Sequence, residues 1–165
     1  MSLPRTATVE DWPAIYPFLR TTMDEGRTYA WPAGQPFDEA NAWWMEKPPG
    51  RTVVAVDDGT VLGSAKMGPN RPGNGNHIGT ASFLVAPEAR GKGVARALAG
   101  EVVRWHRSEG YRGIQFNAVV ETNAPAVHLW QSLGWEVVGT VPGAFQHPED
   151  GYVGLHVMFK DLTGA

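Results

Sequence analysis

Residues 85–95 read Val-Ala-Pro-Glu-Ala-Arg-Gly-Lys-Gly-Val-Ala, a β-like run stopped by Pro87 and followed by a glycine-rich turn that opens directly into a helical pattern. Gly91 and Gly93 let the backbone of this turn pass close to a ligand. A helix that begins here directs unpaired N–H groups and about +0.5 of dipole charge at whatever lies in front of it. The stretch therefore predicts a cradle for a pyrophosphate. An ordinary strand-to-helix loop is the alternative interpretation.

Other glycine-rich phosphate sites have patterns that this chain lacks, since the turn contains no Gly-Lys-Ser or Gly-Lys-Thr and no Gly-x-Gly-x-x-Gly. The order Arg90-x-x-Gly93-x-Ala95 instead resembles the coenzyme-A signature of the GNAT superfamily of acyl-CoA-dependent N-acyltransferases. A second block is similar to the family pattern Asn-x-x-Ala-x-x-Leu-Tyr-x-x-x-Gly-Phe, and reads Asn123-x-x-Ala126-x-x-Leu129-Trp130-x-x-x-Gly134-Trp135. Two blocks in the right order make the resemblance more specific than either block alone.

Composition limits the classes of protein to consider. A chain of 165 residues predicts a single domain, residues 1–165. The absence of cysteine excludes disulfides and a cysteine nucleophile and fits a cytoplasmic protein. A net charge of −3 disfavours nucleic-acid binding, and no apolar run approaches the length of a membrane span. Five scattered histidines without paired spacing predict no metal site.

Hydrophobic periodicity and turn residues predict the order of helices and strands. Strands are expected at 5–9, 51–56, 61–67, 77–85, 114–120, 135–141 and 152–159, helices after residue 10, at about 37–47, from 94 to 110 and at about 123–133, and long loops at 24–36, 68–76 and 142–151. The GNAT resemblance implies the same order. It implies an α/β (α+β) fold with a central mixed, mostly antiparallel sheet of six or seven strands, splayed between the fourth and fifth strands, and about four helices.

The resemblance also implies that acetyl-CoA binds as co-substrate. The backbone of the fourth strand would pair with the pantetheine arm as another strand would, and the amides of the glycine turn would hold the pyrophosphate. Asn123 would bind the pantetheine amide, although an Asn before Pro125 is also a standard N-cap. The residues expected to bind the cofactor are Phe83, Leu84, Val85, Arg90, Gly91, Lys92, Gly93, Val94, Ala95, Asn123, Ala126 and Trp130.

The reaction implied is attack of a neutral amine on a thioester. Some family members place a carboxylate base in the fourth strand, but this chain has none there. Glu121 and His77 are the nearest titratable candidates, with a helix cap and a strand-end histidine as the alternatives. Trp130 stands where the family has the tyrosine proposed to protonate the leaving thiolate, and indole cannot replace that acid. Trp130 could equally pack in the core.

The acyl acceptor is the least specified part of the site. In this fold two loops set specificity, so Tyr29, Trp31 and Phe145 could line an aromatic pocket, or anchor their loops on the core. The segment 116–123 looks like that of fungal GNAT enzymes that acetylate proline analogues such as azetidine-2-carboxylate. That likeness implies a small amino-acid substrate with Asn117 as a carboxylate ligand, although an Asn in a strand could equally bond to neighbouring backbone.

These observations together predict an N-acetyltransferase that moves an acetyl group from acetyl-CoA to a primary or secondary amine of a small molecule or amino acid. A catalytically silent CoA-binding module and a protein or peptide N-acetyltransferase are the alternatives. An exposed strand or helix could also form a homodimer.

Overall fold

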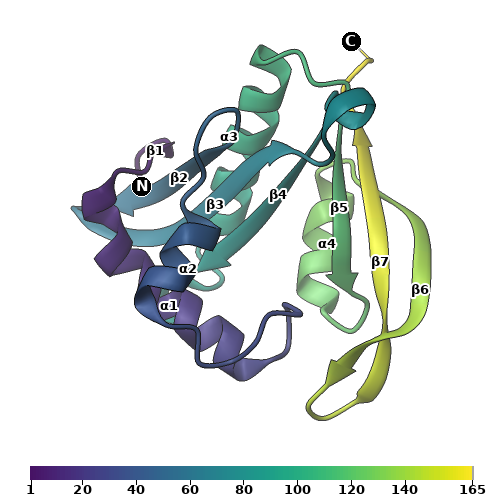
Figure 1. Ribbon diagram of the computed structural model, residues 1–165, viewed down its shortest axis with the longest axis horizontal. Coiled ribbons are helices and arrows are strands. Elements are labelled where there is room, and N and C mark those ends of the chain that lie inside the picture. Colours follow the sequence, from purple (N-terminus) through teal and green to yellow (C-terminus); the bar gives the residue numbers. More distant parts are fainter. Residues whose placement is uncertain (165) are drawn as a thin grey trace.

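The computed structural model describes residues 1–164, which form one seven-stranded sheet in the order β1-β2-β3-β4-β5-β7-β6 (Figure 1). The strands are β1 (Arg5–Thr6), β2 (Arg51–Asp57), β3 (Thr60–Pro69), β4 (Ile78–Val85), β5 (Gly113–Val120), β6 (Glu136–His147) and β7 (Gly151–Asp161). The helices are α1 (Trp12–Glu25), α2 (Phe37–Trp44), α3 (Val94–Ser108) and α4 (Ala124–Ser132). Only β4 and β5 pair in parallel. The predicted mixed, mostly antiparallel GNAT-type fold is confirmed.

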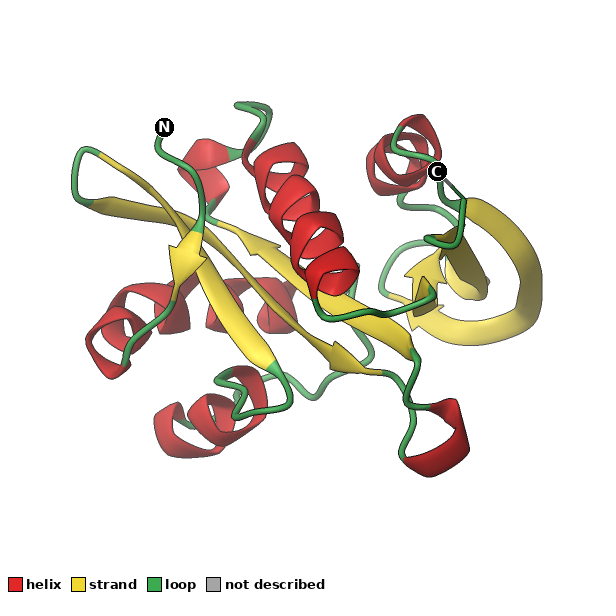
Figure 2. Ribbon diagram, turned by 90° about the horizontal axis from the view of Figure 1, so that it is seen from above, coloured by secondary structure: helices red, strands yellow, loops and turns green. Residues whose placement is uncertain are grey.

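Helices cover both faces of the sheet, as the view from above shows (Figure 2). The helix α3 packs on β3 and β4 from one face, whereas α1 and α2 lie on the other. Of the apolar positions that predicted α3, Val94, Leu98 and Val102 are buried, and Trp105 is partly buried. Because parallel neighbours need a crossover connection, α3 is also the element that lets β5 lie beside β4.

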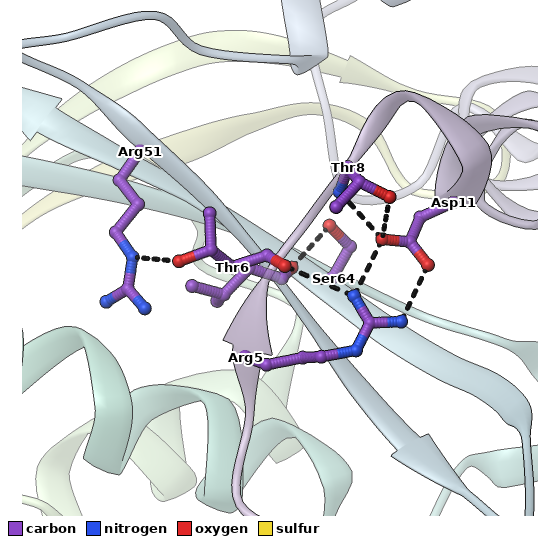
Figure 3. A network of polar contacts seen from close by, with 7 residues as sticks. Arg5, Thr6, Thr8, Asp11, Arg51 and Ser64 are labelled. Atoms are coloured by element: carbon purple, nitrogen blue, oxygen red, sulfur yellow. Dashed lines mark hydrogen bonds and ion pairs between the residues drawn. The ribbon is translucent and has the colours of Figure 1, made fainter.

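The first predicted strand is shorter than expected, and a polar network explains why (Figure 3). Residues 5–9 were expected as a strand, but β1 ends at Thr6 and a 3-10 turn, η1 (Val9–Asp11), follows. The Asp11 carboxylate accepts two bonds from the Arg5 guanidinium, at 2.8 and 2.9 Å, and one from the Thr8 amide at 2.7 Å. These bonds turn the chain away from the sheet and into α1.

The second helix also stops early, at Trp44 instead of Lys47. The hydroxyl of Thr52 in β2 donates to the Trp44 carbonyl and accepts from the Glu46 amide, both at 2.9 Å. The Thr52 side chain therefore forms hydrogen bonds with backbone groups that would otherwise be paired within another turn of the helix.

The largest error concerns residues 142–151, which were expected as a long loop. In the structure β6 continues to His147, so the connection to β7 is only three residues long. The pairing of β6 with β7 shifts register between Val141 and Phe145, where Gly143 has φ 63°. Because β6 is the edge strand, Pro142 and Gly143 can lie in such a bulge without costing an inner ladder bond.

Candidate active site

The central feature of the site is the gap between β4 and β5. The two strands pair only at Ile78–Gly113 and Gly79–Ile114, and then diverge (Figure 1). Further along, aromatic rings occupy the α4 side of the gap: Phe83 lies 5.8 Å from Phe116 and 4.7 Å from Trp130, measured between ring centroids. The expected splay is present, and the edge of β4 beyond Gly79 has no neighbouring strand.

The glycine turn between β4 and α3 has the form that a phosphate cradle requires. Gly91 and Gly93 adopt φ 77° and 80°, which disfavours other residues, and apart from the adjoining residues no atom of residues 1–164 lies within 4 Å of where either Cβ would be. The first amide of α3 to find a helical acceptor is that of Ala97, which donates to the Gly93 carbonyl at 3.0 Å. The amides of residues 94–96 therefore precede the helical ladder and point out of its N-terminus.

A second helix N-terminus lies across the gap, at α4. The Asn123 side chain accepts from the Ala126 amide at 3.4 Å, so the N-cap interpretation of Asn123 is confirmed. Arg96 of α3 donates to Ser132 of α4 at 3.1 Å and links the two helices. Binding of pantetheine by Asn123 stays a prediction.

Tyr29, expected in the acceptor pocket, reaches the exposed edge of β4. Its hydroxyl donates to the Phe83 carbonyl at 2.7 Å and accepts from the Phe83 amide at 2.8 Å. Burial raises the pKa of Tyr29 to about 12, against the opposing effect of the bonds to Phe83. The Tyr29 hydroxyl is therefore protonated throughout the physiological pH range.

The two candidate bases occupy very different places. Glu121 follows β5 at the open end of the gap, where its carboxylate accepts from the Gly154 amide of β7 at 2.5 Å. His77 precedes β4 at the closed end and lines a cavity of about 630 Å³ together with Trp105 and Glu109. The eight residues of β4 span about 26 Å, so the structure separates His77 from the glycine turn and does not bring it to the site.

The predicted acceptor residues are only partly brought together. Trp31 stacks on Trp43 of α2 with ring centroids 3.5 Å apart. Phe145 is 5 % exposed and packs in a small apolar cluster with Val120 and Val153, so its ring serves as a core residue next to the turn of the β6–β7 hairpin.

Asn117 belongs to a row of hydrogen-bonded side-chain amides. It is exposed, it donates to the Asn70 side chain at 2.7 Å, and it accepts from Gln115 at 2.9 Å. Asn70 lies just after β3, whereas Asn117 and Gln115 lie in β5. This row of side-chain amides, the amide row, therefore connects the two parts of the sheet on either side of the gap.

Two features near the gap were not recognised from the sequence. Lys66 of β3 donates to the Trp43 carbonyl at 2.9 Å and lies 3.5 Å from the Glu46 carboxylate. These two charged residues line a cavity of about 220 Å³ beside Thr80 and Ser82 of β4. Burial lowers the pKa of Lys66, against the opposing effect of Glu46. No sequence pattern signals the cavity, because its walls come from three separate segments.

The second feature is an ion pair between Arg27, in the α1–α2 loop, and Glu149, in the β6–β7 turn. It connects residues 122 positions apart. The only signal in the sequence was opposite charge in two loops already expected to flank the acceptor.

The described part of the chain also shows two absences. No helix in residues 1–164 is long and apolar enough to cross a membrane. Over the same residues, no three His, Cys, Asp or Glu side chains gather as they would around a metal ion.

Comparison with known proteins identifies the family, because the model of the acetyltransferase (GNAT) family matches residues 12–135. The chain belongs to this family. The GNAT resemblance drawn from the two sequence blocks is thereby confirmed.

Curated relatives of this GNAT chain include two acetyltransferases. It is 32 % identical over 111 residues to N-acetyltransferase aca1 of Schizosaccharomyces pombe, covering 66 % of this chain and 53 % of the relative. It is 32 % identical over 145 residues to the L-methionine sulfoximine/L-methionine sulfone acetyltransferase of Pseudomonas aeruginosa, covering 84 % of this chain and 82 % of the relative. The chain thus spans about half the length of the first relative and most of the second.

Solved structures agree with this GNAT assignment. A GCN5-related N-acetyltransferase from Kribbella flavida is 57 % identical, with a TM-score of 0.94 over 96 % of both chains. The yncA protein of Salmonella typhimurium is 23 % identical with a TM-score of 0.86, over 98 % of this chain and 94 % of that one, and therefore shares the fold. That structure was solved with its cofactor acetyl-CoA.

Proposed function

We propose that the chain is an acyl-CoA-dependent N-acetyltransferase that transfers an acetyl group from acetyl-CoA to the amine of a small amino acid. The observation that carries the proposal is the glycine turn, in which Gly91 and Gly93 keep the space in front of the α3 amides open. Unpaired amides at a helix N-terminus suit a pyrophosphate. Next to them, the edge of β4 beyond Gly79 lacks a strand partner, which suits pairing with the pantetheine arm that carries the thioester.

The acceptor enters from the side of the gap that carries the amide row. The side-chain amides of Gln115, Asn117 and Asn70 provide uncharged N–H donors. Such donors suit the carboxylate of an amino-acid substrate, because they leave the amine of the same substrate free to react. The Pseudomonas relative is named for two amino-acid derivatives, which supports this substrate class.

Such a substrate still has to lose a proton before its amine can attack the thioester. At pH 7 that step costs about 1 kcal/mol for the terminal α-amine of a peptide, with a pKa near 7.8, and about 4.6 kcal/mol for a lysine-type amine; a free amino acid lies between the two, because its own carboxylate stabilises the ammonium form. Glu121 is the one candidate base at the open end of the gap, where its carboxylate accepts from the Gly154 amide. We assign Glu121 the role of accepting the amine proton through water.

The cradle is tested by Gly93→Val with Gly110→Val as a matched control. Gly110 ends α3 with φ 82°, nearly the φ of 80° at Gly93, and both positions lack neighbours within 4 Å among the described residues. Both variants should therefore lose similar stability, while only Gly93→Val should bind coenzyme A more weakly, by about tenfold or more. Equal calorimetric affinity in the two folded variants would refute the proposal.

A second candidate function is a silent CoA-binding module, favoured by Trp130, which is 7 % exposed among aromatic rings and offers no acid. Release of free CoA thiol separates the two functions. We expect release with methionine sulfoximine, methionine sulfone or azetidine-2-carboxylate, and little with a peptide acceptor. Tight coenzyme-A binding with no thiol release on any acceptor would favour the silent module.

We further propose a single cytoplasmic domain that forms a homodimer through the edge strand β6. The outer surface of the hairpin exposes Val138 by 69 %, Val141 by 55 % and Tyr152 by 75 %, which is apolar area that a second copy could bury. Light scattering at micromolar concentration, repeated with Val138→Lys, tests this assembly: a monomer in both samples would exclude it.

A further inference from the structure

The hydroxyl of Tyr29 occupies both backbone groups of Phe83, at the edge of β4 where the pantetheine arm is proposed to bind. The two distances of 2.7 and 2.8 Å are those of good hydrogen bonds. A backbone amide has one proton to donate, so the Phe83 N–H can serve Tyr29 or an arriving ligand but not both.

The segment that carries Tyr29 is held in this position. The Asp24 carboxylate accepts from the Gly34 amide at 2.7 Å, and the Tyr16 hydroxyl donates to the Gln35 carbonyl at 2.7 Å. Trp31 adds its stack on Trp43. The loop between α1 and α2 is therefore ordered around Tyr29.

A second contact from the same segment reaches the other end of the proposed cofactor site. The Glu25 carboxylate lies 3.4 Å from the guanidinium of Arg90, a residue expected beside the pyrophosphate. Glu25 and Tyr29 are only four residues apart, but Glu25 contacts the glycine turn through Arg90, whereas Tyr29 contacts the edge of β4. The pair Glu25–Arg90 is exposed and weak on its own, so Tyr29 is the stronger of the two contacts.

We propose that the segment 25–29 blocks the acyl-CoA groove of its own chain, with the Tyr29 hydroxyl standing in for the ligand on Phe83, so that loading requires Tyr29 to leave. The inference rests on the proposed function. Its consequence is that part of the binding free energy is used to break the two bonds to Phe83, which lowers the apparent affinity of the free protein.

The test compares Tyr29→Phe with Tyr16→Phe by calorimetry. Tyr29→Phe keeps the ring and removes only the competing hydroxyl, whereas Tyr16→Phe removes a hydroxyl that anchors the same loop without touching β4. We expect Tyr29→Phe to bind acetyl-CoA about fivefold more tightly than the unmodified chain. Tyr16→Phe should leave the affinity unchanged.

A fragment of the cofactor sharpens the comparison. 3′-Phosphoadenosine 5′-diphosphate carries the phosphates but no pantetheine, so its affinity should be the same for Tyr29→Phe and the unmodified chain. Unchanged or weaker acetyl-CoA binding by Tyr29→Phe overturns the inference while the proposed function stands. Equal tightening for the fragment, or for Tyr16→Phe, also overturns it, because general loosening of the loop would then be the cause. If no variant binds acetyl-CoA, the proposed function fails and the inference fails with it.

Discussion

The indole ring of Trp130 lies against the ring of Phe83, with centroids 4.7 Å apart and planes inclined at 38°. Trp130 also contacts Phe116 at 5.0 Å, so it joins the two strands that border the gap. At this position the family has the tyrosine proposed as the acid for the leaving thiolate. In this chain the position instead closes an aromatic cluster, and the acid is missing.

Trp130→Tyr should therefore accelerate acetyl transfer relative to Trp130→Phe, which restores no hydroxyl. A thiol pKa of about 8.5 makes thiolate a fair leaving group, so we expect a gain in kcat of about tenfold, below the usual contribution of a general acid. Steady-state thiol release measures the gain. Equal kcat in the two variants would show that water already supplies the proton.

The ion pair between Arg27 and Glu149 should affect acceptor binding more than stability. Both side chains are exposed, so Arg27→Glu or Glu149→Arg alone should leave the melting temperature nearly unchanged. Each should raise KM for the amino acid a few-fold, about two- to fivefold, by releasing one loop from the other. The double exchange should restore KM, and failure to restore it would mean that the charges act separately.

The pH dependence of kcat/KM should follow the amine of the acceptor. For a free α-amino acid, whose carboxylate raises the pKa of the amine above the peptide-terminal value of about 7.8, we expect kcat/KM to rise with pH and level off between about pH 8 and pH 10, because the neutral amine is the nucleophile. A substrate with a lysine-type amine should keep rising to about pH 10. Initial rates from pH 6 to 10 with both acceptors give the comparison, and the same plateau for both would mean that an enzyme group titrates instead.

The Arg5–Asp11 pair predicts a pH-dependent contribution to stability (Figure 3). Hydrogen bonds from Arg5, ahead of those from Thr8 and against desolvation, lower the pKa of Asp11 below its ordinary 3.8. A lowered folded-state pKa stabilises the fold above about pH 4, and the contribution is lost as pH falls through that folded-state value. Asp11→Asn should therefore cost about 1–2 kcal/mol at pH 7 and progressively less as the pH falls below about 4, by urea unfolding. A cost independent of pH would contradict this account.

Much of the fold and the cofactor cradle could be predicted because their signals are local. The helical spacing of Val94, Leu98, Val102 and Trp105 predicted α3, and the first three are buried. Gly91 and Gly93 predicted a tight turn, and both have positive φ. Turn chemistry depends on residues a few positions apart, which a sequence displays directly.

The predicted ends of α2 and β6 were wrong because contacts with residues distant in the sequence determine where these elements end. Thr52 ends α2 by bonding to Trp44, and the edge position of β6 lets Pro142 remain in a strand. Neither fact is visible in the segment concerned, since tertiary contacts override local preference.

By itself, the sequence determined the order of elements, the GNAT family and the two helix N-termini that face the gap, because periodicity and glycine positions encode them within short windows. Only the tertiary structure decided that Tyr29 reaches the backbone of Phe83, 54 residues away, and that His77 lies at the closed end of the gap. These relationships depend on how β4 and the α1–α2 loop pack together. Such packing is set by the whole core, and no short stretch of residues specifies it.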